Sequence, residues 1–259
     1  MIMGDLSNIC SFDDRVAVVT GAAGNIGKAI VRRLVSHGVK VAAFDVRPPD
    51  VERLFAAETS AGATIRAYGV DVTDGRGARQ SVAQVISDFG KIDILVNNAG
   101  VWEHRGTVGC HRFETVPPEE WRRLLDIDIG GVMNFTQAVL PRMLERGYGR
   151  IVNLGSIAGL VGKPGYGDYS AAKAAVIMLT KTLAMENAKR GITVNSVSPG
   201  MVAAGEIRRT PGTWMGHEGT ADEMARAIVF LAADESGFLT GVDIPVDGGR
   251  VLGPHGDDM

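Results

Sequence analysis

Short apolar runs alternate with longer helical patterns along almost the whole chain of 259 residues, and this alternation constrains the fold more than any other feature. The runs are rich in Val and Ile, and several are apolar throughout, as is typical of strands that helices cover on both faces. They lie at residues 15–20, 40–46, 64–70, 92–98, 150–156, 192–198 and 243–247. Helix-length segments lie between them, at residues 26–37, 74–89, 119–146, 168–189 and 221–233. The pattern predicts an α/β fold with a doubly wound, mostly parallel sheet and right-handed crossovers.

Length and composition favour one domain over residues 1–259, with its core at about residues 12–250, because no linker interrupts the pattern and 45% of the residues are hydrophobic. A formal charge of −3 gives no basic field for a nucleic acid. The two cysteines, Cys10 and Cys110, form neither a disulfide framework nor a metal-ligand spacing. Without a leader pattern or a run of ~18 apolar residues, we expect a cytoplasmic protein with no metal and no membrane partner.

The stretch TGAAGNIG, residues 20–27, joins the first apolar run to the first helical segment. Gly21 allows a tight turn, and the start of the following helix favours the charge of a phosphate. The glycine spacing fits either nucleotide-sugar epimerases or a dehydrogenase loop in which Asn25 replaces the middle glycine. We favour the dehydrogenase loop, because only about ten residues follow VDGG and leave little room for a nucleotide-sugar region. We expect Asn25 to occupy a left-handed backbone, which Asn tolerates better than most residues.

Asp45 ends the second apolar run, 18 residues after Gly27. A carboxylate at about this offset meets the ribose hydroxyls of a dinucleotide and repels a 2′-phosphate, so that NAD is favoured over NADP. Arg47 follows closely and could soften this preference. The alternative is that Asp45 only caps a helix or a turn. Asp71 and Val72, after the third run, are placed to contact an adenine edge.

Tyr169 and Lys173, in YSAAK, lie four residues apart and therefore share one face of a helix. A free phenol, with a pKa of ~10, is a poor base, but a neighbouring ammonium favours its ionised form and lets it exchange a proton with an alcohol or carbonyl oxygen. A Tyr and Lys pair alone is also common on surface helices. Ser156 strengthens the prediction, because it ends a strand 13 residues before Tyr169 and can hydrogen-bond the same substrate oxygen. Tyr166 has Ser170 in place of the lysine, so we assign it to the pocket wall.

These motifs, with NNAG at residues 97–100, SPG at 198–200 and VDGG at 246–249, occur in an order that resembles the short-chain dehydrogenase/reductase family over nearly the whole chain. The resemblance implies a seven-stranded Rossmann-like sheet and NAD(P)-dependent hydride transfer at an alcohol carbon. It also implies a homotetramer or homodimer in which the long helices at 119–146 and 168–189 pack across subunits. The cofactor-binding residues that it implies are Gly21, Gly24, Asn25, Ile26, Gly27, Asp45, Asp71, Val72, Asn98, Ala99, Gly100, Tyr169, Lys173, Pro199, Gly200 and Val202.

The chain departs from the family pattern at Asp128, where relatives usually carry an Asn that holds a water connected to the lysine. Asn134 cannot replace it, because six residues on it points elsewhere around the helix. We expect Asp128 to keep the proton relay and to favour a protonated Lys173. The alternative is an impaired relay with low turnover. At Ala204, many relatives have a Thr that contacts the nicotinamide carboxamide.

Two segments that follow strand ends, at 101–118 and 201–220, escape the alternating pattern and are expected to shape the substrate pocket, the earlier one more strongly. Aromatic and Met side chains there suit an apolar or ring-shaped substrate, whereas an Arg could bind a carboxylate or phosphate, although solvent exposure is its usual role. The residues that we assign to this pocket are Trp102, His104, Gly155, Tyr166, Trp214 and Met215.

Three functions compete at this point. The leading one is an NAD-dependent oxidoreductase that interconverts a small secondary alcohol and a ketone, with Ser156, Tyr169, Lys173 and Asp128 at its catalytic centre. The second is an NADPH-dependent 3-oxoacyl carrier-protein reductase, which Asp45 disfavours. The third is a nucleotide-binding sensor with little catalysis, suggested by Asp128 but opposed by the intact Ser, Tyr and Lys set.

Overall fold

The computed structural model describes residues 10–103 and 111–253, which form seven parallel strands in one sheet. The strand order is β3-β2-β1-β4-β5-β6-β7, so the chain leaves β1 for one side of the sheet and then crosses to β4 on the other. This order confirms the predicted doubly wound, Rossmann-like α/β fold. The strands are β1 (Val16–Thr20), β2 (Lys40–Asp45), β3 (Ile65–Gly69), β4 (Ile94–Asn97), β5 (Gly149–Leu154), β6 (Ile192–Pro199) and β7 (Asp243–Val246).

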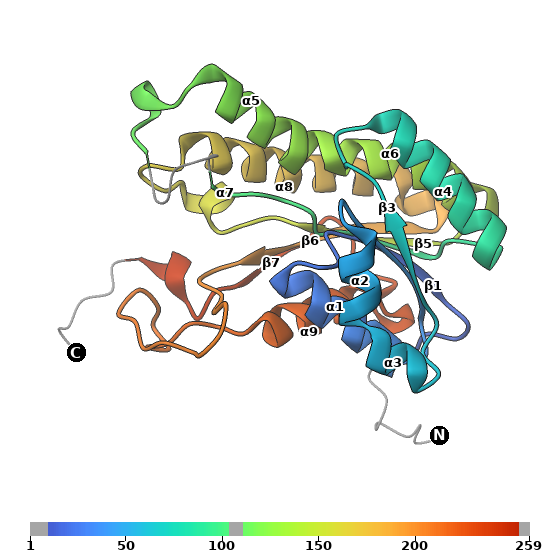
Figure 1. Cartoon of the computed structure of the whole chain (residues 1–259). Coiled ribbons are helices and arrows are strands. Elements are labelled where there is room, and N and C mark those ends of the chain that lie inside the picture. Colours follow the sequence, from blue (N-terminus) through green and yellow to red (C-terminus); the bar gives the residue numbers. More distant parts are fainter. Residues whose placement is uncertain (1–9, 104–110, 254–259) are drawn as a thin grey trace.

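Helices cover both faces of the sheet (Figure 1). One face carries α1 (Asn25–Ser36) and α9 (Ala221–Ala232), and the other carries α4 (Gly75–Phe89), α6 (Gly131–Arg146) and α8 (Gly167–Asn187). Local sequence signals begin two of these helices. Asp74 accepts a hydrogen bond from the Arg76 N–H at the start of α4, and Thr220 and Glu223 form a capping box at the start of α9.

The helix predicted at 119–146 is divided into α5 (Pro118–Leu125), a π-helical turn η2 (Asp126–Gly130) and α6. Asp128 lies in this turn and is fully buried. Single π-helical turns inside α-helices occur frequently at functional sites. Three further short helices were not predicted, namely α2 (Pro48–Leu54), α3 (Ala56–Ser60) and α7 (Ala158–Val161).

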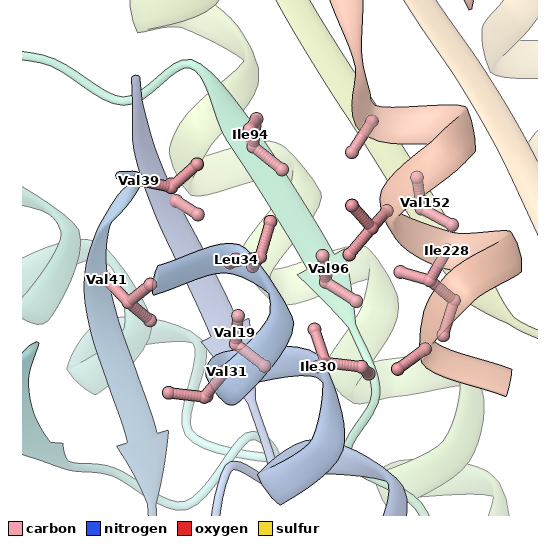
Figure 2. Close-up of a cluster of buried hydrophobic side chains, with 14 of the residues drawn as sticks. Val19, Ile30, Val31, Leu34, Val39, Val41, Ile94, Val96, Val152 and Ile228 are labelled. Carbon is pink, nitrogen blue, oxygen red and sulfur yellow. The ribbon is translucent and has the colours of Figure 1, made fainter. Parts of the chain in front are cut away.

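A cluster of aliphatic side chains fills the space between the sheet and the helix pair α1 and α9 (Figure 2). Ile30 and Leu34 of α1 and Ile228 of α9 are fully buried in it. Each such side chain stabilises the fold by about 1.5–3 kcal/mol relative to an exposed position. A second cluster lies between the opposite face and the helices α4 and α6. The two clusters together hold the carboxyl ends of the strands rigidly at one edge of the sheet.

The burial of the strands explains why they could be predicted from the sequence. Strands β1, β4 and β5 are buried at every residue and are mainly aliphatic, although β4 also buries Asn97 and β5 buries Arg150 and Asn153. No helix in the described part of the chain is long and apolar enough to span a membrane.

Candidate active site

A cavity of about 850 Å³ runs along the carboxyl edge of the sheet. Open α/β sheets bind ligands at this edge, at the point where the strand order reverses. Residues that end or follow each strand line the cavity. In the order of the strands across the sheet they are Asp71 (β3), Asp45 (β2), Gly21 (β1), Asn98 (β4), Ser156 (β5), Gly200 (β6) and Arg250 (β7).

The glycine loop between β1 and α1 forms the wall of this cavity with almost no side chains. Gly21 has a φ of +63°, and a Cβ there would lie 2.8 Å from the Ala99 Cα. A Cβ on Gly27 would lie 2.1 Å from the Gly21 carbonyl oxygen. Gly24, the N-cap of α1, leaves the amino terminus of this helix uncovered by any side-chain cap. The loop therefore fits a pyrophosphate, which needs a close backbone approach at a helix amino terminus.

The structure corrects the expected conformation of Asn25. This residue begins α1, and among the described residues the only non-glycine with a positive φ is Asp14. The left-handed position in the loop belongs to Gly21. The Asn25 side chain instead donates a hydrogen bond from Nδ2 to the Ala203 carbonyl oxygen, 2.9 Å away. It thereby joins the loop after β1 to the segment after β6, a contact between residues that lie far apart in the sequence.

Residues of the motif NNAG hold the glycine loop through hydrogen bonds. The Asn98 side chain donates hydrogen bonds to the carbonyl oxygens of Thr20, at 2.9 Å, and Gly21, at 3.0 Å. The Thr20 hydroxyl oxygen accepts hydrogen bonds from the backbone N–H groups of Asn98 and Ala99, both at 3.0 Å. Asn98, Ala99 and Gly100 all line the cavity, and the Asn98 side chain holds the glycine loop in place through these hydrogen bonds.

At the end of β2, beside the glycine loop, the Asp45 carboxylate accepts a hydrogen bond at 3.1 Å from the Ala23 N–H. Arg47, expected to be the nearest competing charge, forms an ion pair with Asp50, with Nε 3.1 Å from Oδ2. Arg53 also contacts the Asp50 carboxylate. The Arg47 cation therefore has a carboxylate partner next to the cavity, which it shares with Arg53.

The turn after β3 carries the two predicted adenine-edge residues. Asp71 accepts hydrogen bonds from the N–H and hydroxyl of Thr73, so its carboxylate also shapes this turn. Val72 is buried, and its carbonyl oxygen accepts a hydrogen bond at 2.8 Å from the Asn134 side chain. Asn134 thus holds the turn after β3, a role that the sequence did not reveal.

Tyr169 and Lys173 both line the cavity from α8, and Ser156 lines it from the loop after β5. The Lys173 Nζ lies 5.6 Å from the centre of the Tyr169 ring and donates a hydrogen bond to the Leu154 carbonyl oxygen at 3.1 Å. Ser156 is nearly buried, and its hydroxyl oxygen accepts a hydrogen bond from the Ala158 N–H at 3.2 Å. A phenol, an ammonium and a hydroxyl therefore share the wall of one cavity with the glycine loop.

Asp128 contacts Lys173 directly. Its Oδ2 lies 3.1 Å from the lysine Nζ, and its Oδ1 accepts a hydrogen bond at 2.7 Å from the Val101 N–H. The side chains are 0% and 5% exposed. A Cβ on Gly100 would lie 3.2 Å from both Asp128 Oδ2 and Lys173 Nζ, so a glycine there leaves room for the pair.

Burial and charge act in opposite directions on this pair. Burial alone would lower the pKa of Lys173, but the Asp128 carboxylate raises it above its ordinary value. Burial raises the pKa of Asp128, against the opposing effects of the Lys173 ammonium and the Val101 N–H. A protonated lysine beside Tyr169 is thus maintained by a buried counter-ion.

Trp102, Gly155 and Tyr166, which the sequence assigned to the substrate pocket, line the same cavity as Tyr169. The ring centre of Tyr166 lies 6.5 Å from that of Tyr169 and 6.3 Å from that of Trp102. His104 lies outside the described residues. Trp214 and Met215 do not line the cavity. They are exposed and lie beside Gly249 and Gly248, because the segment at 201–220 folds back on the turn after β7.

Several residues that the sequence did not assign also line the cavity, among them Lys163, Met201 and Arg250. Segment 201–220 contains no helix, and only its first two residues reach the cavity. No group of three or more His, Cys, Asp or Glu side chains that could hold a metal ion occurs in residues 10–103 and 111–253.

Comparisons with known proteins agree with this geometry. The family model described as short chain dehydrogenase matches residues 15–214. An acetoacetyl-CoA reductase of Shinella zoogloeoides is 39% identical over 246 residues, which cover 91% of this chain and 98% of the relative. A 3-oxoacyl-acyl-carrier-protein reductase of Thermotoga maritima is 35% identical over 249 residues, covering 93% and 99%. The crystal structure of gox2181 superposes with a TM-score of 0.86 at 31% identity and covers 94% of this chain and 98% of that one.

Proposed function

Because the chain belongs to the short-chain dehydrogenase/reductase family and is an NAD(P)-dependent ketoreductase acting on a CH–OH group, we propose the finer assignment of an NAD-dependent enzyme with Tyr169 as its acid and base. One observation carries the proposal: Ser156, Tyr169 and Lys173 share a single cavity with the glycine loop and Asp45. The bound nicotinamide would accept or supply the hydride.

Each of the three side chains has a separate task in this proposal. Tyr169 exchanges a proton with the substrate oxygen, taking it from the alcohol during oxidation and returning it to the carbonyl oxygen during reduction. The Lys173 ammonium favours the ionised phenol. Ser156, nearly buried with its hydroxyl in the cavity wall, orients the same substrate oxygen.

Asp128 acts through Lys173 and is therefore a positioning residue. Its carboxylate lies 3.1 Å from the lysine Nζ and has no access to solvent, so it favours the charged ammonium without an intervening water. We propose that this contact replaces the water that relatives hold with Asn. The sensor alternative loses its main support, because Asp128 has a role that does not require lost catalysis.

The preference for NAD rests on charge at the ribose end. The described residues around Asp45 in the cavity wall include one cation, Arg47, and that cation is paired with Asp50. A 2′-phosphate would meet the Asp45 carboxylate, and the Arg47 guanidinium could offset the repulsion only by giving up its contact with Asp50. We expect Asp45→Ala to lower the ratio of kcat/KM for NAD to that for NADP at least tenfold. Asp45→Glu, which keeps the charge, should preserve the NAD preference.

The second candidate, an NADPH-dependent 3-oxoacyl carrier-protein reductase, is favoured by the relatives named for that activity. Steady-state kinetics with acetoacetyl-CoA and each reduced cofactor separate the two. A strong NADPH preference in the wild type would overturn the assignment to NAD.

The proposed acid and base is tested with a matched pair of tyrosines. Tyr169→Phe should lower kcat by about 10²- to 10⁴-fold, because it removes the group that transfers the proton. The NADH affinity, measured by fluorescence titration, should change little. Tyr166→Phe, a neighbouring tyrosine in the same cavity wall, should retain most of the activity. Equal losses in the two variants, or none in Tyr169→Phe, would refute the assignment.

We also propose that two copies associate through α6 and α8. Met133 on α6 and Met178 and Met185 on α8 are 45%, 60% and 77% exposed, and an interface through these helices would bury them. Light scattering of wild type and Met185→Glu would test this association. A wild type that is monomeric at micromolar concentration would exclude it.

A further inference from the structure

Arg250 lines the cavity at the edge of the sheet opposite the cofactor's ribose end. It follows β7, whereas Asp45 ends β2 on the other side of the switch point. Ser156 follows β5, two strands away from β7. Because neighbouring strands lie ~4.8 Å apart, the ends of β5 and β7, which Ser156 and Arg250 follow, are separated by roughly 10 Å. A substrate that occupies both positions extends beyond its carbonyl group toward Arg250.

The Arg250 guanidinium is anchored by one end only. Its Nη1 donates a hydrogen bond to the Gly212 carbonyl oxygen at 2.6 Å and lies 3.1 Å from the Met201 sulfur. Nε and Nη2 carry the other three N–H donors of the group and have no hydrogen-bond acceptor in the described part of the chain. Such a fork is oriented by its anchor while its remaining donors suit a carboxylate or phosphate.

No carboxylate among the described residues forms an ion pair with Arg250, although Asp247 lies only three residues away. Both oxygens of Asp247 are used by the turn after β7, since Oδ1 accepts the Gly249 N–H at 2.9 Å and Oδ2 accepts the Val251 N–H at 2.8 Å. The contrast with Arg47, the other arginine in the cavity wall, is direct, because Arg47 is paired with Asp50.

Toward Arg250, the charged side chains in the described cavity wall are cations. The described lining contains the carboxylates of Asp45 and Asp71 toward the cofactor's ribose end, and that of Asp128, which is paired with Lys173. Lys163 adds a second cation beyond Tyr169, with its Nζ 4.0 Å from the centre of the Tyr166 ring. An anion bound at this end meets positive charge without a competing carboxylate in the described wall.

We infer that the substrate of this ketoreductase carries an anionic group, a carboxylate or a phosphate, which Arg250 binds while the carbonyl lies at Tyr169. This inference rests on the proposed function and names the substrate class of the same site. A carboxylate in an oxo acid and a phosphate in a coenzyme A thioester share this chemistry, so the experiment must separate them.

The test compares matched substrates with and without an anionic group. With saturating reduced cofactor, we would measure kcat/KM for acetoacetate, 4-oxopentanoate and 5-oxohexanoate and for their methyl esters. A second pair, acetoacetyl-4′-phosphopantetheine and acetoacetyl-pantetheine, differs by one phosphate and tests the phosphate source. The wild type should prefer the charged member of at least one pair, and the preferred pair identifies the anion.

Arg250→Gln should reduce that preference by about 10- to 100-fold, the range for losing a charge-assisted hydrogen bond, while leaving the neutral partner nearly unchanged. Arg250→Lys keeps the charge and should retain part of the preference. Arg209→Gln removes an exposed arginine of the neighbouring segment that does not line the cavity, and it should match the wild type.

Two results would overturn the inference and leave the proposed function intact. One is equal use of charged and neutral members of every pair by the wild type. The other is an equal loss on both members in Arg250→Gln, which would show that Arg250 only holds the Gly212 segment in place. Failure to reduce any carbonyl compound would instead refute the proposed function, and the anion inference with it.

Discussion

Asp128→Asn is the substitution that most directly tests the buried ion pair, because it removes one charge with little change in shape. In the wild type, Lys173 Nζ lies 3.1 Å from Asp128 Oδ2, and both side chains are almost completely shielded from water. Two unit charges about 4 Å apart interact by ~4 kcal/mol at an effective dielectric constant of ~20. Removing one partner of a buried pair typically costs about 3–5 kcal/mol, because the remaining charge stays desolvated. We therefore expect a loss of about 3–5 kcal/mol in the free energy of unfolding at neutral pH.

The pH dependence of this loss follows from Lys173. Asp128 raises the pKa of Lys173 above the ordinary 10.5, so the pair stabilises the fold at pH values below 10.5 and that stabilisation is lost as the pH rises through the folded-state value. In Asp128→Asn, burial is opposed only by the nearby Tyr169 phenol, and we expect it to lower the pKa of Lys173. The lysine then loses its proton within the accessible alkaline range, and the activity that depends on its charge should fall at lower pH than in the wild type. The difference in stability between the two proteins should narrow toward pH 10.5 and above.

The assay combines thermal unfolding with pH–rate profiles of kcat. A loss of 3–5 kcal/mol corresponds to a decrease in Tm of roughly 6–20 °C for a chain of this size. A double-mutant cycle with Lys173→Met supplies the control for stability, since removing both charges should cost less than the sum of the two single changes. Additive losses, together with a pH–rate profile identical to that of the wild type, would refute the reasoning and return Asp128 to a packing role.

Three further predictions concern the surroundings of the site. Asn25→Gly should leave NAD affinity within about threefold but lower the free energy of unfolding by about 1–2 kcal/mol, through the lost hydrogen bond to Ala203 and the greater freedom of glycine; a severe loss in a cofactor titration would mean that the side chain itself binds the cofactor. Gly100→Ala should lower Tm and kcat together by pressing on the buried ion pair, at an expected cost of about 1–3 kcal/mol, and unchanged kinetics would show that the pair has room to shift. Burial alone would raise the pKa of Asp234, but its hydrogen bond from Tyr148 and the nearby guanidinium groups lower it; Asp234→Asn should therefore be less stable than the wild type from pH 8 to 5, with a difference that shrinks below about pH 4 in urea unfolding, and a difference that persists there would exclude the carboxylate charge as its cause.

Whether a helix or strand could be predicted depended on how clear its local sequence pattern is. The strand at 150–156 could be predicted from the apolar residues at its centre, Ile151 and Val152, although β5 also buries Arg150 and Asn153. The short helix α2 was missed because its seven residues give too few turns for an amphipathic period, and its two prolines resemble a loop. The π-helical turn η2 was also missed, since it changes the hydrogen-bonding partner along the backbone without changing the apolar pattern around it.

Some residues of the site could likewise be predicted from the sequence, and others could not. Tyr169 and Lys173 could be paired from the sequence because four residues on a helix fix their relative direction. Trp214 and Met215 were assigned to the pocket from their chemistry alone, and the fold turns them toward the segment after β7 instead. Arg250 had no local signal, because its importance depends on β7 standing at one edge of the sheet and on Asp247 being occupied elsewhere.

Two of the departures from the family pattern, Asn25 and Asp128, have a common physical logic. At each position a side chain provides a direct contact between parts of the fold: the Asn25 amide reaches the Ala203 carbonyl, and the Asp128 carboxylate reaches the Lys173 ammonium. Both contacts join elements across the cavity wall, the first between the loops after β1 and β6 and the second between η2 and α8. Because a direct polar contact holds two elements at a fixed separation, substituting either residue should alter the cavity's shape as well as its local chemistry. Replacing Asn25 by glycine or Asp128 by asparagine therefore restores the family residue but also removes a contact on which the rest of this site depends.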